Sequence, residues 1–187
     1  MGSRLLASMV VAAMLSAAAD PRVERINRQI EAMQSGRAKP GSVFVLPAVD
    51  LDAWARAKAV EVVPEGLREP RLELGTGSAT AFALVDFLKV RHAAGVETNW
   101  LVAKLIQGEK PVQVTAQIRS ANGRATVHLT RVEIGGLAVS GAPLDFLIQT
   151  FFLPLYPNAK IDEPFELADG VDRIEVRPAE VRVWMKK

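Results

Sequence analysis

The residues whose chemistry could make this chain an enzyme or a metalloprotein are few. The 187 residues include two histidines and no cysteine. Without cysteine the chain has no thiolate for a zinc site, an iron–sulfur cluster or a nucleophile. His92 follows a predicted strand, and His128 is expected on the polar, exposed face of another strand. Because the two histidines are far apart and have no partners at ligand spacing, they predict no metal site.

The other candidate motifs also depart from the patterns that their chemistry requires. The segments Gly75–Ala79 and Val139–Gly141 both lack the G-x-S-x-G turn that exposes a nucleophilic serine. The acidic residues between positions 162 and 172 lack calcium-loop spacing, and Gly135-Gly136 opens no helix that could bind phosphate. Asp50-Leu51-Asp52 is more typical of a helix start than of a carboxylate pair. We therefore expect no enzyme activity and no cofactor.

Charge and composition narrow the class of partner. The chain has 23 basic and 21 acidic residues, a balance that does not favour nucleic-acid binding. Its hydrophobic content of 49% and charged content of 24% are typical of a globular chain with a core. The length after the first nineteen residues suits one domain, over positions 20–187.

The first nineteen residues have the pattern of a signal peptide. Met1–Arg4 carries one positive charge, Leu5–Leu15 is apolar apart from one serine, and Ser16–Ala19 ends in small residues. The apolar segment is too short to span a bilayer. We predict cleavage after Ala19 and export to the periplasm or the medium. The alternatives are a short buried helix and an uncleaved anchor.

The elements that follow alternate between helices and strands. Asp20 is a helix cap with Pro21 at the first helical position, and apolar residues recur every three or four positions to Met33. A second helix is expected to begin after a cap at Asp50. The other elements predicted before position 110 are strands at 43–46, 71–74 and 76–90, and a short helix at about 100–107.

A hairpin is the most specific local prediction. Asn122-Gly123 lies between apolar strands at 111–121 and 124–135, and this dipeptide favours a two-residue turn. The turn pairs Ile118 with Val127, but strict pairing would later place valines opposite charged residues. One extra residue at Thr130 or Arg131 restores apolar pairs, so we predict a β-bulge there.

The last elements complete the fold class. We expect an apolar helix at 143–153 and a terminal hairpin of strands 171–177 and 181–185. Together these elements predict an α+β fold: a strongly curved antiparallel sheet, an N-terminal amphipathic helix, and an apolar helix that covers the sheet.

The strand at 76–90 and the helix at 143–153 have more apolar surface than a simple packing needs. The surplus is either solid core or a groove for an apolar ligand. A third interpretation is an exposed lip at residues 153–156 that touches a membrane transiently. The residues expected to form the groove are Phe82, Leu84, Phe87, Leu88, Trp100, Leu101, Phe146, Leu147, Phe151, Phe152, Leu155 and Tyr156.

Two segments resemble a known group of proteins. Gly141–Leu147, ahead of Pro154 and Pro157, and Pro164–Val176 are similar to the strand–helix–strand ending of AsmA-like and tubular lipid-binding proteins. The resemblance covers about residues 71–187 and implies an extracytoplasmic protein that binds lipid in a groove, with no catalytic residue. This chain is short for the group and would form half a tube or a compact version.

The sequence thus predicts an exported, non-enzymatic protein that binds a lipid or another apolar molecule. The alternative is an envelope scaffold or assembly protein with a solid core, which would hold a protein partner through a sheet edge or its first helix.

Overall fold

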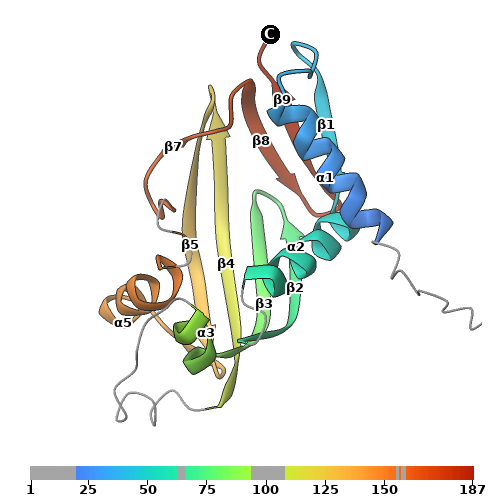
Figure 1. The fold of residues 1–187 in the computed structure, drawn as a ribbon. Helices are drawn as coiled ribbons and strands as arrows, with labels where there is room; N and C mark the ends of the chain where they lie inside the picture. The colour runs from blue at the N-terminus through green and yellow to red at the C-terminus, as the bar shows by residue number, and fades with distance from the viewer. Residues whose placement is uncertain (1–19, 63–65, 94–107, 155, 157–158) are drawn as a thin grey trace, which may run out of the picture.

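The computed structural model describes residues 20–62, 66–93, 108–154, 156 and 159–187. The predicted signal peptide and the predicted helix at about 100–107 lie outside these residues. The described chain forms two antiparallel sheets with helices, which confirms the α+β class (Figure 1). Neither sheet is strongly curled, so the predicted strong curvature is not confirmed.

The smaller sheet joins the two ends of the described chain. Its strand order is β1-β9-β8, with β1 at Val43–Pro47, β8 at Val171–Arg177 and β9 at Glu180–Met185. Helix α1, Pro21–Gln34, lies across this sheet (Figure 1). The Asp20 carboxylate accepts a hydrogen bond from the backbone N–H of Arg22, as expected of a cap. The shared core consists of Ile26, Met33, Leu46, Val171, Val183 and Met185.

Helix α2, Ala48–Val62, contacts helix α1 and the larger sheet through the two carboxylates near its start. Asp50 is buried and accepts two hydrogen bonds of 2.8 Å from the Arg25 guanidinium of α1. These bonds hold the pKa of Asp50 below its usual value. Asp52 accepts a 2.8 Å hydrogen bond from the backbone N–H of Leu72. The prediction that Asp50 caps this helix is wrong, because the helix begins at Ala48 and Asp50 lies in its first turn.

The larger sheet has the order β2-β3-β4-β5-β6, with β7 also paired to β5. Its strands are β2 at Leu67–Gly75, β3 at Ser78–Asp86, β4 at Glu109–Ala121, β5 at Arg124–Ile134, β6 at Leu137–Ala138 and β7 at Phe165–Glu166.

The predicted hairpin is confirmed in its turn and its register. Asn122 and Gly123 have φ angles of 52° and 74°, as a type I′ turn requires. Ile118 faces Val127, and the register shifts next to Thr115 so that Thr130 is the extra residue. Beyond the bulge Val114 faces Val132.

Two strands have ends that differ from the sequence prediction. β3 ends at Asp86, not at Val90, because the Asp86 carboxylate accepts hydrogen bonds from the backbone N–H groups of Leu88 and Lys89. These bonds start helix α3, Phe87–Ala93. β2 begins earlier than predicted and continues through Pro70, where its pairing with β3 shifts between Arg68 and Arg71.

The turns of the larger sheet lie against β8, the edge strand of the smaller sheet. The backbone N–H of Gly77 donates to the carbonyl of Val176, and that of Gly123 donates to the carbonyl of Asp172. Between them the Ser120 hydroxyl accepts from the N–H of Ile174 and donates to its carbonyl. These bonds satisfy alternate residues of β8, which would otherwise present an open edge.

Among the described elements, helices α3 and α5 lie on one face of the larger sheet (Figure 1). Helix α5, Ala142–Leu147, continues into the π-helical turn η1, Ile148–Phe152. In the described part of the chain, no helix has both the length and the apolar character needed to cross a bilayer.

Candidate ligand-binding pocket

The helix-covered face of the larger sheet is apolar because alternate residues of four strands point to it. The register aligns Leu72, Ala81, Val114 and Val132 in one row across the sheet. The next row on this face is Ala83, Val112 and Ile134. The face is therefore smooth and carries small residues at its centre.

The helices cover this face at one end only. Phe87 and Val90 of α3 pack with Phe151 of η1 in a buried cluster. The rings of Phe87 and Phe151 meet edge to face with centroids 5.1 Å apart. This cluster holds the end of α5 and η1 at a fixed position over the sheet.

Beside that cluster is a cavity of about 480 Å³ between the sheet, α2 and the α5–η1 segment. Its volume lies within the range of about 300–1,000 Å³ typical of ligand sites. Ala81 at the centre of the sheet is exposed, as expected if no side chain fills the space above it. The lining is Ala55, Ala59, Leu67, Pro70, Arg71, Leu72, Ala81, Phe82, Ala83, Val85, Phe87, Val90, Val112, Val114, Leu129, Val132, Ile134, Leu144, Leu147, Ile148, Phe151, Phe152, Tyr156 and Ile161.

The π-helical turn gives the cavity its aromatic wall. The backbone N–H of Leu153 donates to the carbonyl of Ile148, five residues back. Phe151 is buried, whereas its neighbour Phe152 is 38% exposed and packs on Tyr156 with ring centroids 5.2 Å apart. Such turns occur frequently at functional sites because they change which side chains a helix presents.

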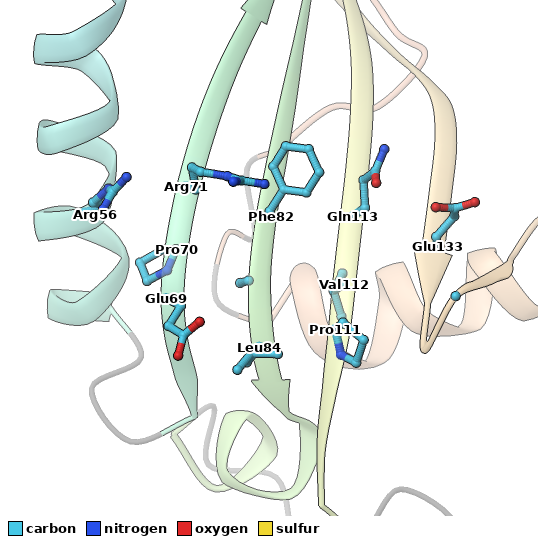
Figure 2. A pocket seen from close by; sticks show the side chains of 12 residues that line it. Arg56, Glu69, Pro70, Arg71, Phe82, Leu84, Pro111, Val112, Gln113 and Glu133 are labelled. Carbon is cyan, nitrogen blue, oxygen red and sulfur yellow. The ribbon is translucent and has the colours of Figure 1, made fainter.

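The opposite face of the sheet forms a groove of about 610 Å³ with a more polar lining (Figure 2). Arg71, Phe82, Gln113 and Glu133 follow one another across β2 to β5. The Arg71 guanidinium lies 4.4 Å from the centroid of the Phe82 ring, a cation–π contact. Arg56 of α2 borders the same groove (Figure 2).

The charges of this groove are partly neutralised by their neighbours. Arg56 lies 2.7 Å from Asp52, and Glu133 lies 2.5 Å from Arg131. Arg71 has a longer contact, 3.5 Å from its Nε to Glu73, and all these pairs are partly exposed to water. The groove can therefore bind polar groups but holds no isolated buried charge.

Six of the predicted groove residues line the apolar cavity: Phe82, Phe87, Leu147, Phe151, Phe152 and Tyr156. Three predicted residues lie elsewhere. Leu84 lines the outer groove, Leu88 lines neither space, and Phe146 is 55% exposed on α5. Trp100, Leu101 and Leu155 lie outside the described residues.

The sequence prediction missed the floor of the cavity. Its residues come from β4 and β5, chiefly Val112, Val114, Val132 and Ile134. The predicted hairpin register already placed these residues on one face, and the small Ala81 on the neighbouring strand was the signal that this face had room.

Whether the described residues could hold a metal ion depends on how their possible ligands are grouped. In the residues that the structure describes, no group of three or more histidine, cysteine, aspartate or glutamate side chains could hold a metal ion. His128 contacts Asp162 on the exposed side of β5, opposite Gln117. Comparison with known proteins adds no assignment, since no family model, curated protein or solved structure matches the chain.

Proposed function

We propose that this chain binds a lipid or a similar apolar ligand in the cavity between the larger sheet and the α5–η1 segment. The observation that carries the proposal is an open, almost wholly apolar space above the small central residues Ala81 and Ala83. A solid core would fill this space with side chains. The proposal does not need a strongly curled sheet, because helices α2 and α5 form the walls.

The mechanism is transfer of an acyl chain from water into this space. Each methylene group that leaves water contributes about 0.8 kcal/mol. The lining has few polar groups to lose their hydration when the ligand enters. No covalent step is involved, and the protein acts as a non-enzymatic carrier or sensor.

We further propose that the protein acts outside the cytoplasm, in the periplasm or the medium. The support is the charged, apolar and small-residue pattern of positions 1–19. Sequencing the N-terminus of the protein recovered from its own cells tests this, with Asp20 expected as the first residue. An N-terminus at Met1 would contradict it.

Native mass spectrometry tests the binding proposal. The protein is incubated with phosphatidylethanolamine and phosphatidylglycerol vesicles, separated from them, and weighed. We expect one lipid per chain, and an unliganded mass alone would refute the proposal.

Two exposed phenylalanines of the same helical segment provide a matched pair of variants. Phe152 lines the cavity and Phe146 does not, although both are exposed. Phe152→Ala is expected to lower the lipid-bound fraction, and Phe146→Ala to leave it unchanged. Equal effects would mean that the lipid does not occupy this cavity.

A second candidate function rests on strand β1. Val43 and Val45 are 45% and 40% exposed on the edge strand of the smaller sheet, and Val49 is 65% exposed close by. Uncharged edges with exposed valines favour pairing with another strand. This would suit an envelope scaffold, and Val45→Lys would then abolish partner capture without changing lipid binding.

A further inference from the structure

The apolar cavity and the outer groove meet at one seam. Arg71 and its neighbour Pro70 line both spaces, as do Phe82, Ala83 and Val112. The seam lies where the pairing of β2 with β3 shifts between Arg68 and Arg71. A bulge of this kind bends an edge strand and re-aims its side chains.

Helix α2 borders the seam on its other side. Ala55 and Ala59 line the apolar cavity, whereas Arg56 lines the outer groove. Small residues therefore face the apolar space, and a long cationic side chain reaches over the polar one. A ligand at the seam would pass from an apolar wall to a cationic one within one turn of α2.

Charge is distributed unevenly between the two spaces. Among the described residues that line the apolar cavity, Arg71 is the only charged one. Glu69 and Glu133 line the outer groove but not the apolar cavity. The charged group that borders the apolar cavity is thus a guanidinium.

The Arg71 side chain retains capacity to bind an anion. Its ion pair with Glu73 uses Nε, over 3.5 Å, and both side chains are more than half exposed. Its face stacks on Phe82, which fixes the plane of the guanidinium (Figure 2). Among the described residues, Glu73 is the only ion-pair partner of Arg71. Planar guanidinium groups bind carboxylate and phosphate through paired hydrogen bonds.

We infer that the ligand is an amphiphile with an anionic headgroup, a carboxylate or a phosphate, which Arg71 binds at the seam with Arg56 beside it. The tail lies in the apolar cavity, so the inference rests on the proposed function. Carboxylates come from free fatty acids and phosphates from phospholipids, and the guanidinium chemistry is common to both.

Three ligands with one tail and different headgroups test the inference. The assay measures displacement of a neutral fluorescent probe, N-phenyl-1-naphthylamine, from the full chain. The competing ligands are dodecanoate, dodecyl phosphate and dodecanol, each added separately. We expect one or both anions to bind roughly tenfold more tightly than dodecanol. This factor is at the low end of the range for a charge-assisted hydrogen bond, because Arg71 is half exposed to water. The tighter anion distinguishes a fatty acid from a phosphate lipid.

Variants of Arg71 separate headgroup recognition from tail binding. Arg71→Gln should remove the preference for anions, so that dodecanoate and dodecyl phosphate bind no more tightly than dodecanol, and Arg71→Lys should retain part of the preference. Arg119→Gln is the matched control, since Arg119 is exposed on the same sheet and lines neither space.

The outcomes also separate this inference from the proposed function. Equal binding of all three ligands, or an anion preference that survives Arg71→Gln, would overturn the headgroup assignment and leave tail binding intact. If none of the three displaces the probe, the proposed function fails as well.

Discussion

Enlarging Ala81 distinguishes an open cavity from a solid core by the sign of a stability change. Ala81 lies on β3, between Leu72 and Val114 in the register, and points into the apolar cavity. Ala81→Leu adds three carbon atoms to that space. At about 0.8 kcal/mol for each buried carbon, the upper limit of stabilisation is about 2.4 kcal/mol. The cavity is partly open, so we expect a gain of about 1 kcal/mol.

The opposite sign is expected if side chains already fill this space. Overpacking a filled core costs typically about 1–3 kcal/mol because neighbours must leave their preferred rotamers. Ala125 of β5 provides that comparison, since it is 3% exposed. We expect Ala125→Leu to lower the free energy of unfolding by an amount in that range.

The assay is urea unfolding of the lipid-free protein, followed by circular dichroism, for the wild type and both leucine variants. The same Ala81→Leu protein should bind lipid at least tenfold more weakly, because the added side chain occupies the site. A loss of stability in Ala81→Leu similar to that in Ala125→Leu would refute the cavity, and unchanged lipid affinity would refute its role in binding.

Three further predictions concern the contacts that hold the site in place. Phe151→Ala should lower the free energy of unfolding by about 3 kcal/mol in urea titrations, because Phe151 is buried, whereas exposed Phe152→Ala should change it by less than about 1 kcal/mol. Arg25 holds the pKa of Asp50 below its usual value of 3.8. The stabilisation that this ion pair gives the folded protein should therefore be complete above about pH 5 and decline as the pH falls through 3.8 and lower. In unfolding measured from about pH 7 to 3, the free energy of unfolding should decline less steeply in Asp50→Asn than in the wild type. Ser120→Ala removes both hydrogen bonds from the hydroxyl to β8 and should cost about 1–2 kcal/mol by the same urea assay, and no change would mean that these bonds do not join the sheets.

The sequence predicted the elements whose position is determined by a few neighbouring residues. The Asn122-Gly123 turn, together with the apolar pairs on either side, was enough to predict a bulge at Thr130 or Arg131, and the extra residue is Thr130. Asp20 and Pro21 similarly located the start of α1. In both cases the determining residues lie within a few positions of the element that they specify.

Contacts between distant segments could not be predicted in this way. The division into two sheets depends on β1 pairing with β9, about 140 positions later in the chain. The role of Asp50 depends on Arg25 of a different helix, and a local pattern cannot distinguish this ion pair from a cap. The surplus apolar surface at 76–90 and 143–153 left a solid core, a groove and an exposed lip open as interpretations. The position of the cavity on the Ala81 face follows from packing that alternation alone does not specify.

The most direct test of the account is to locate a bound acyl chain. A fatty acid that carries a diazirine along its tail is equilibrated with the protein, photolysed, and mapped by peptide mass spectrometry. We expect labels on peptides that contain residues 112–134 and 144–152, and fewer labels in Ala81→Leu. Labelling confined to the exposed valines of β1, or none that exceeds the label on unfolded protein, would contradict a lipid site between the sheet and the α5–η1 segment.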